Sequence, residues 1–281
     1  MFNDKPGHCN ILAHEINLVE GFKPKSQRPY RIPDKLKGAV DEQLDELLEM
    51  GKIRQSNSEY AHPIICVSKP NGQIRLCCDL RYINSGTIND AYPMPRNEEL
   101  LAKICAAKYV TTVDCSSGFW QIPMRESDYH KTAFTCHRGL FEWVYMPFGC
   151  RTASNTYQRV MDRLLLPHSE YASAYIDDTA IYSGSWNSHM LHTRAVLLSF
   201  RKSGMTLKLA KCKFGKSRVK FIGHEVGSGL RLPIGSKVES IKAIPEPPTK
   251  KLLRSFLGMC NFYRVYICLL YTSPSPRDIS G

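Results

Sequence analysis

Apolar side chains recur at helical spacing in several segments of the chain. The first stripe lies in the acidic segment 34–50, which Gly51 ends, and consists of Val40, Leu44, Leu47 and Leu48. The second ends before Pro167 and consists of Tyr157, Val160, Met161, Leu164 and Leu165. Gln158 and Arg159 lie off this second stripe. Helices are also predicted over 188–203 and 249–264, and a capping box at Ser236 and Glu239 predicts a short helix between them.

Runs of β-forming residues predict strands between these helices. The runs 64–68 and 74–78 flank Lys69-Pro70-Asn71-Gly72, which is a hairpin signal. A further strand is predicted over 108–113, and β-like segments continue from 206 to 226. Residues 2–33 show no sustained period, so we expect an extended arm at this end.

Two adjacent carboxylates, Asp177 and Asp178, lie between β-forming runs in 174–182, which predicts a hairpin with an acidic turn. Neighbouring anions repel each other unless a cation lies between them. A third carboxylate, Asp114, follows the strand 108–113 just before the turn signal Ser116-Ser117-Gly118. Three carboxylates offer only hard oxygen ligands, which favours Mg²⁺ or Mn²⁺ over zinc. From these residues alone, a solvated acidic turn without a metal remains the alternative.

The composition is that of a globular protein. The 281 residues are 43% hydrophobic and 23% charged, which suits roughly two domains or subdomains. No apolar run approaches the roughly 20 residues of a membrane span, so we expect a soluble, intracellular protein without a membrane partner. The 11 cysteines have irregular spacing and are expected to be reduced and mostly buried.

Positive charge is concentrated in one segment. The chain carries a formal net charge of +12, and residues 201–220 hold eight Lys or Arg and no Asp or Glu. A polyanion is a natural partner for such a segment, because each phosphate that a cation neutralises releases condensed counterions. A solvated basic face is the alternative that charge alone leaves open.

Eight motifs follow one another along the chain at characteristic spacing. They are SKPNGQIRLCCDLRYIN (68–84), TTVDCSSGFWQI (111–122), KTAF (131–134), MPFG (146–149), YIDDTAIYS (175–183), KCKF (211–214), FIGHEV (221–226) and LRSFLGMCNFYR (253–264). Through this series, residues 30–263 resemble the reverse transcriptase of gypsy-type long-terminal-repeat retrotransposons and, more distantly, of retroviruses. YIDD alone is a weak signal, whereas the ordered series is specific.

The resemblance implies an α+β fold, the right hand of polymerases, with fingers, a palm built on an antiparallel sheet, and part of a thumb. The implied division is an extended N-terminal arm (1–33), fingers (34–88 and 122–151), palm (89–121 and 152–228), partial thumb (229–266) and a tail (267–281). The tail departs from the family, and we expect it to be non-native and disordered.

The same resemblance implies a polymerase site for two-metal nucleotidyl transfer. Asp114 and Asp177 are expected to ligate Mg²⁺, for which Mn²⁺ can substitute, and Asp178 to be a weaker third ligand. The residues that match positions for the incoming deoxynucleotide are Lys69, Arg75, Phe119 and Gln158. The residues that match contacts to template and primer are Arg81, Asn84, Tyr175, Phe221, Ile222, Gly223 and His224. An aromatic ring at Phe119 would exclude a 2′-hydroxyl.

The implied activity is RNA- and DNA-directed DNA synthesis from deoxynucleoside triphosphates during retrotransposition. The expected partners are a primed RNA or DNA template and the protease, ribonuclease H and integrase modules of a Pol polyprotein, in cytoplasmic virus-like particles. The positions that depart from the family pattern are Asn71, Leu80, Cys150 and Ser154. These departures keep open a catalytically impaired remnant that only binds nucleic acid. A third alternative is an RNA-templated RNA polymerase, against which Phe119 argues.

Overall fold

Three sheets and the helices packed on them organise the chain in the computed structural model, which describes residues 1–68 and 74–267. The α-helices are α1 (Asp34–Glu49), α2 (Arg81–Gly86), α3 (Asn97–Cys105), α4 (Ala153–Leu165), α5 (Trp186–Lys202), α6 (Gly235–Lys242) and α7 (Lys250–Phe262). The 3-10 helices are η1 (Gly118–Gln121), η2 (Glu126–Thr132), η3 (Leu166–His168), η4 (Leu209–Lys211) and η5 (Arg264–Tyr266). The strands are β1 (Ile53–Gln55), β2 (His62–Ser68), β3 (Ile74–Cys78), β4 (Tyr109–Val113), β5 (Phe134–Cys136), β6 (Gly139–Trp143), β7 (Ala172–Tyr175), β8 (Asp178–Ser183), β9 (Lys213–Lys216), β10 (Val219–Phe221), β11 (His224–Gly227) and β12 (Leu230–Pro233).

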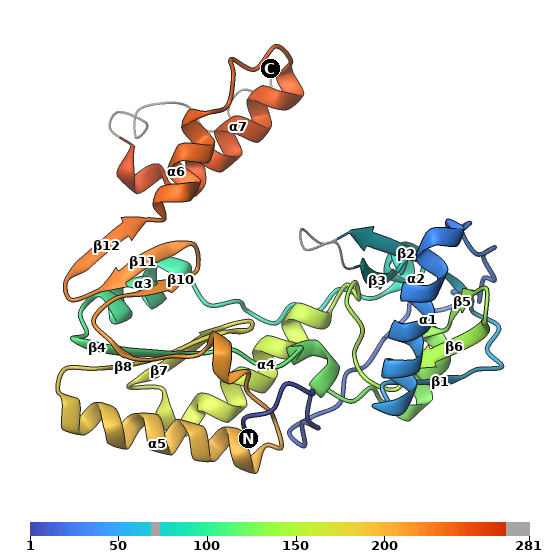
Figure 1. The fold of residues 1–281 in the computed structure, drawn as a ribbon, viewed down its shortest axis with the longest axis horizontal. Helices are drawn as coiled ribbons and strands as arrows, with labels where there is room; N and C mark the ends of the chain where they lie inside the picture. Colours follow the sequence, from blue (N-terminus) through green and yellow to red (C-terminus); the bar gives the residue numbers. More distant parts are fainter. Residues whose placement is uncertain (69–73, 268–281) are drawn as a thin grey trace.

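A five-stranded mixed sheet and α1 form one lobe of the molecule (Figure 1). Its strand order is β1-β6-β5-β2-β3, in which β2 and β5 are parallel and the other neighbours antiparallel. Helix α1 packs on this sheet and buries Val40, Leu44 and Leu47. The predicted helix 34–50 and the predicted strands on either side of residues 69–73 are therefore confirmed.

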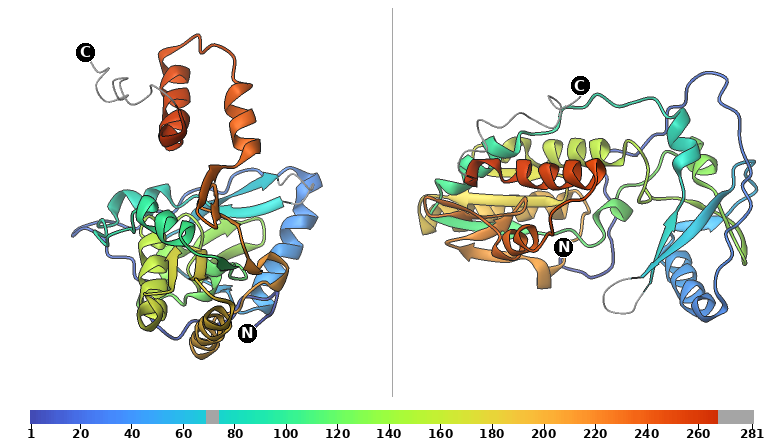
Figure 2. Two further views of the ribbon diagram at one scale, coloured as in Figure 1. Left: turned by 90° about the vertical axis from the view of Figure 1, so that its left-hand side faces the viewer. Right: turned by 90° about the horizontal axis from the view of Figure 1, so that it is seen from above.

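A four-stranded antiparallel sheet, the central sheet, forms the middle of the molecule in the order β7-β8-β4-β9. Helices α4 and α5 cover one of its faces (Figure 1 and Figure 2). The predicted stripe from Tyr157 to Leu165 is buried in α4, which ends just before Pro167. A second apolar cluster joins α3, β8 and the three-stranded sheet β10-β11-β12, and it includes Leu101 and Phe221.

Helices α6 and α7 follow β12 and project away from the sheets (Figure 1). The side chain of Thr249 caps α7 by accepting a hydrogen bond from Leu252 N–H at 3.3 Å. The predicted capping box is wrong, because α6 already begins at Gly235 and Ser236 lies inside it. The Glu239 carboxylate pairs with Lys242 at 3.1 Å instead of reaching back to the start of the helix.

The predicted N-terminal arm is extended, without a helix or a strand of a sheet. It runs from the central sheet to the mixed sheet and forms isolated bridges at Phe2 with Leu207 and at Ser26 with Ala61. Six of the described cysteines are buried, as expected: Cys9, Cys78, Cys115, Cys136, Cys212 and Cys260. Within residues 1–68 and 74–267, no helix has the length and apolar character needed to span a membrane. The predicted tail lies outside the described residues, apart from its first residue, Ile267.

Candidate active site

Three carboxylates lie at one end of the central sheet. Strands β4 and β8 pair antiparallel, and the last pair in their register is Val113 with Thr179. The next residues beyond this pair, Asp114 and Asp178, therefore lie at the same end of the sheet. Asp177 precedes Asp178 in the tight turn between β7 and β8. The structure thus brings together the three carboxylates that the sequence singles out.

The turn that carries Asp177 is held from α4 by Gln158. The Ile176 N–H donates to Gln158 Oε1 at 2.7 Å, and Nε2 donates to the Ala174 carbonyl at 3.1 Å and to Asp162 Oδ1 at 2.8 Å. Ile176 has a φ of 54°, which is unfavourable for a β-branched residue. Gln158 lies off the apolar stripe of α4, yet its side chain is 0% exposed, because these hydrogen bonds satisfy its amide.

A lysine already neutralises one of the three carboxylates. Lys211 Nζ lies 3.2 Å from each carboxylate oxygen of Asp114. The pKa of Asp178 is raised by partial removal from solvent and then by the charge of Asp177, while the backbone N–H of Ile222 lowers it. Negative charge is therefore concentrated at this end of the sheet, and the cation that pairs with it belongs to the chain itself.

The donor set suits Mg²⁺ or Mn²⁺, because carboxylate oxygens are hard ligands. In the described parts of the chain, no group of three or more His, Cys, Asp or Glu side chains is arranged to enclose a metal ion. Mg²⁺ in polymerase sites is held by one or two carboxylates together with substrate phosphates rather than by a complete protein cage. Asp114 and Asp177 fit such a shared site in ligand type, and neither is buried.

Phe119 follows the strand that delivers Asp114 and lies in η1. Its ring stacks on Phe148, with ring centroids 5.2 Å apart, and lies 5.4 Å from the ring of Tyr157. Ser117, with a φ of 49°, makes the turn that brings η1 back toward α4. Phe148, which was not predicted as a site residue, is 36% exposed although it is a large apolar residue. Its place in the motif MPFG was the signal that the sequence offered.

Two of the residues expected at the triphosphate are not placed. Lys69 lies outside the described residues, and so does the side chain of Arg75. The backbone of Arg75 belongs to β3, where it pairs with Val67. The strands of this hairpin are therefore described, whereas its tip and the two cations remain expectations.

The expected template contacts have protein partners in the free chain. The guanidinium of Arg81 donates two hydrogen bonds to the buried carboxylate of Asp79, whose pKa these bonds lower to about 2. The Arg81 side chain stays 81% exposed, so it remains accessible to a ligand. Asn84 donates to the Gly149 carbonyl at 2.7 Å. Tyr175 is partly buried at the end of β7, remote from these residues in the sequence.

The expected primer-binding segment forms the tight turn between β10 and β11. Phe221 and His224 pair across the hairpin and are each 2% exposed, so their side chains do not face a nucleic acid. Ile222 and Gly223 form the turn itself, with φ values of 42° and 72°. The Tyr263 hydroxyl donates to the Gly223 carbonyl at 3.0 Å, which connects the turn to the end of α7. The turn is therefore the part of this segment that a ligand can reach, and the contact with a primer stays a prediction.

A cavity of about 600 Å³ joins the acidic end to the basic segment. Its charged lining residues are Asp114, Asp178, Lys211, Lys213, Lys216, Arg218, Lys220 and Glu225. Lys211 pairs with Asp114, whereas the other four cations have no carboxylate partner within the described part of the chain. The basic segment thus faces the carboxylates instead of lying on a remote surface.

Known proteins share both the sequence pattern and the fold. Residues 67–226 match the family model for reverse transcriptase (RNA-dependent DNA polymerase). The chain is 39% identical over 250 residues to the retrovirus-related Pol polyprotein from transposon opus of Drosophila melanogaster, covering 87% of this chain and 25% of that protein. It thus spans about a quarter of the length of that relative.

Solved structures of a foamy viral protease-reverse transcriptase superpose closely on this chain. A complex with double-stranded DNA gives a TM-score of 0.84 at 27% identity, covering 93% of this chain and 46% of that one. A complex with an RNA/DNA hybrid gives 0.82 at 27% identity, covering 93% and 35%. These matches confirm the predicted α+β polymerase fold. The chain belongs to the reverse transcriptase family, and its relatives are Pol polyproteins of retrotransposons.

Proposed function

We propose that this chain is the DNA polymerase module of a gypsy-type retrotransposon and copies RNA and DNA templates. The observation that carries the proposal is the convergence of Asp114, Asp177 and Asp178 beside a cavity lined by five cations, of which one pairs with Asp114. Relatives of the chain are Pol polyproteins, which supports further polyprotein modules as partners. We propose that these are protease, ribonuclease H and integrase, and that they act together in a cytoplasmic virus-like particle.

The proposed reaction transfers a nucleotide to a primer. The primer 3′-oxygen forms a bond to the α-phosphorus of the deoxynucleoside triphosphate, the bond from this phosphorus to its bridging oxygen breaks, and pyrophosphate leaves. Asp114 and Asp177 would hold Mg²⁺, with Asp178 as a weaker third ligand. Bound there, Mg²⁺ would supply charge neutralisation and a lower pKa for the 3′-hydroxyl.

Other residues of the chain bind and position the substrates in this proposal. Gln158 fixes the turn that presents Asp177. The stacked rings of Phe119 and Phe148 form the surface against which the sugar lies, so a 2′-hydroxyl would meet a ring. Lys69 and Arg75 would bind the triphosphate by charge-assisted hydrogen bonds.

The three parts seen in Figure 1 support the division into fingers, palm and thumb. The fingers would be 34–88 and 122–151, which hold α1 and the mixed sheet. The palm would be 89–121 and 152–228, which hold the central sheet and α4 and α5. We place the start of the thumb after Pro233 rather than at 229, because β12 pairs with β11.

Primer extension on an RNA template with deoxynucleotides and Mg²⁺ tests the proposal. We expect Asp114→Asn and Asp177→Asn each to reduce extension by at least about a thousandfold, because a lost ligand removes several kcal/mol at about 1.4 kcal/mol per tenfold. The matched control is Asp34→Asn at the exposed start of α1, which should extend normally. Full activity of either site variant would contradict the assignment, and binding without extension by the unaltered chain would favour the impaired remnant.

A further inference from the structure

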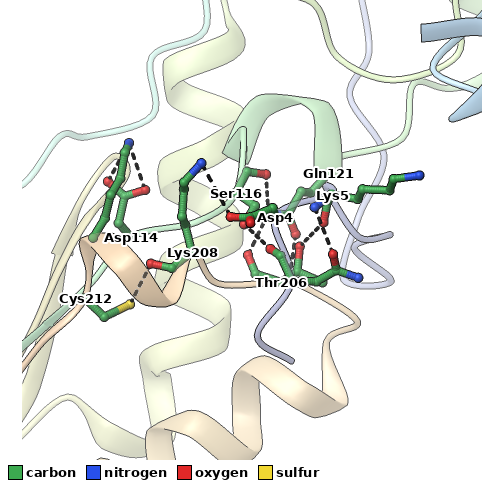
Figure 3. Close-up of polar contacts among 10 residues, drawn as sticks. Asp4, Lys5, Asp114, Ser116, Gln121, Thr206, Lys208 and Cys212 are labelled. Carbon is green, nitrogen blue, oxygen red and sulfur yellow. Dashed lines mark hydrogen bonds and ion pairs between the residues drawn. The ribbon is translucent and has the colours of Figure 1, made fainter. Parts of the chain in front are cut away.

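The first ten residues of the arm lie against a segment that reaches the acidic end of the central sheet. The Met1 carbonyl accepts a hydrogen bond from Leu207 N–H at 2.8 Å, and Asn3 N–H donates to the Leu207 carbonyl at 3.2 Å. Leu207 also bridges to Cys115, the residue after Asp114. The arm, the segment 203–207 and the residues after β4 therefore lie side by side, as Figure 3 shows around Thr206.

Gln121 ties these three segments together. Its Nε2 donates to the Ser116 carbonyl at 2.8 Å and to the Thr206 carbonyl at 2.9 Å, and its Oε1 accepts from Thr206 N–H at 2.7 Å. Its own carbonyl accepts from Cys9 N–H at 2.7 Å. The side chain is 0% exposed, so water cannot replace a lost partner.

The close approach of the arm depends on two glycines. A Cβ on Gly7 would lie 2.3 Å from the Gly204 carbonyl oxygen, and a Cβ on Gly204 would lie 2.2 Å from that of His8. Gly204 also has a φ of 74°, which favours glycine. Any side chain at Gly7 would therefore push the arm away from 203–207 without removing a polar group.

This packing leads directly to Asp114. Lys208, which follows Leu207, donates its N–H to the Asp114 carbonyl at 2.9 Å. The short helix η4 then brings Lys211 to the Asp114 carboxylate. One tied segment thus fixes the backbone of Asp114 and supplies its cation, and Ser116 ties the residues on the other side of Asp114 to Gln121.

We propose that residues 1–10 and Gln121 are a positioning unit for Asp114, so that the arm is part of the catalytic apparatus rather than a linker. The arm lies outside the family match at 67–226, and none of the eight sequence motifs includes it. The proposal rests on the proposed polymerase function for its catalytic consequence. Its structural content, an arm that immobilises the segment 205–211, is measurable without catalysis.

Two variants of the full chain test the unit, each with a matched control. Gly7→Ala displaces the arm, and its control is Gly38→Ala on α1, where an added Cβ meets nothing within 4 Å. Gln121→Glu puts a carboxylate against two carbonyl oxygens, and its control is Gln55→Glu at an exposed position of β1. Single-turnover extension gives the maximal rate per active site and the half-saturating deoxynucleotide concentration. Hydrogen exchange of the substrate-free protein measures how well the backbone amides of residues 205–211 are protected.

We expect both variants to lower the maximal rate about tenfold, the usual cost of losing support behind a metal ligand. The half-saturating deoxynucleotide concentration should change less than about twofold, because neither variant alters a residue expected at the triphosphate, and the Lys208 amide should exchange faster. The controls should match the unaltered chain. A variant that loses thermal stability but keeps its maximal rate would overturn the proposal, since a merely structural arm behaves in that way.

Failure of the two proposals gives different results. If the unaltered chain extends no primer, the polymerase proposal fails, and hydrogen exchange alone then decides whether the arm immobilises 205–211. Unchanged exchange in both variants would refute the positioning unit. If Gln121→Glu does not fold, Gly7→Ala supplies the same comparison, because it alters no buried polar group.

Discussion

Replacing Gln158 with Met tests whether a buried amide holds the turn that carries Asp177. Methionine has a similar volume and removes the hydrogen bonds to Ala174, Ile176 and Asp162. The Asp162 carboxylate is partly exposed, so water can replace its lost donor. Ala174 is only 4% exposed, so its carbonyl would lose its partner without access to water at a cost of about 1–3 kcal/mol. Ile176 is partly exposed, so the loss of the hydrogen bond from its N–H would lower the free energy of unfolding by only about 1 kcal/mol. The free energy of unfolding should therefore fall by about 2–4 kcal/mol.

Urea denaturation followed by circular dichroism measures this change, and primer extension should fall with it because the turn carries Asp177. The control is Arg163→Met on the exposed side of α4, which should stay within about 0.5 kcal/mol of the unaltered chain. Gln158→Glu keeps the acceptor for Ile176 but places a carboxylate oxygen against the Ala174 carbonyl. Protonation of the new carboxyl restores a donor to this carbonyl, so the loss of stability in Gln158→Glu should become smaller as pH falls. A change below about 0.5 kcal/mol in Gln158→Met would refute the reasoning.

Three further changes have defined outcomes. Phe119→Ala should raise ribonucleotide incorporation relative to deoxynucleotide incorporation, because the ring that would meet a 2′-hydroxyl is removed, and an unchanged ratio would make Phe119 a packing residue. The double variant Lys213→Ala and Lys216→Ala should reduce the slope of log binding constant against log salt concentration for primer-template, by up to about 0.9 per lost phosphate contact. An identical slope would place both lysines in bulk solvent. Burial lowers the pKa of His14 to about 4, below its unfolded value of about 6.5. As pH falls from about 6.5 toward 4, the free energy of unfolding measured by urea denaturation should therefore fall by about 3 kcal/mol. An unaltered pH dependence in His14→Gln would contradict that attribution.

Patterns of local spacing predicted much of the fold. The apolar spacing of α1 and α4 and the β-forming runs beside Asp114 and Asp177 depend on interactions within one element, so they can be read from the sequence. The carboxylates themselves were found for the same reason, since Asp114 follows a strand at a turn signal and the Asp177-Asp178 pair lies between two β-forming runs.

Burial that depends on other elements was not predicted. Gln158 is polar, yet it is fully buried because backbone groups of β7 and its turn complete its hydrogen bonds. Phe221 and His224 belong to the motif FIGHEV, yet each is only 2% exposed, because they pair across the hairpin of β10 and β11 and pack against neighbouring elements. The role of the arm was likewise hidden, because its partners near Thr206 are about 200 residues away in the sequence, and its contacts use mostly backbone atoms.

The ion pair between Lys211 and Asp114 would oppose the binding of a divalent cation only weakly. Its two side chains are 60% and 34% exposed, and a pair this exposed contributes about 0–1 kcal/mol. Attraction between unit charges about 4 Å apart is on the order of 4 kcal/mol at an effective dielectric constant of about 20, and it doubles for a divalent ion. Separating Lys211 from Asp114 therefore costs little compared with what a divalent ion would gain from two carboxylates. Lys211 can neutralise Asp114 in the free chain and still leave the carboxylate open to exchange, because both side chains line the cavity and are partly exposed to solvent.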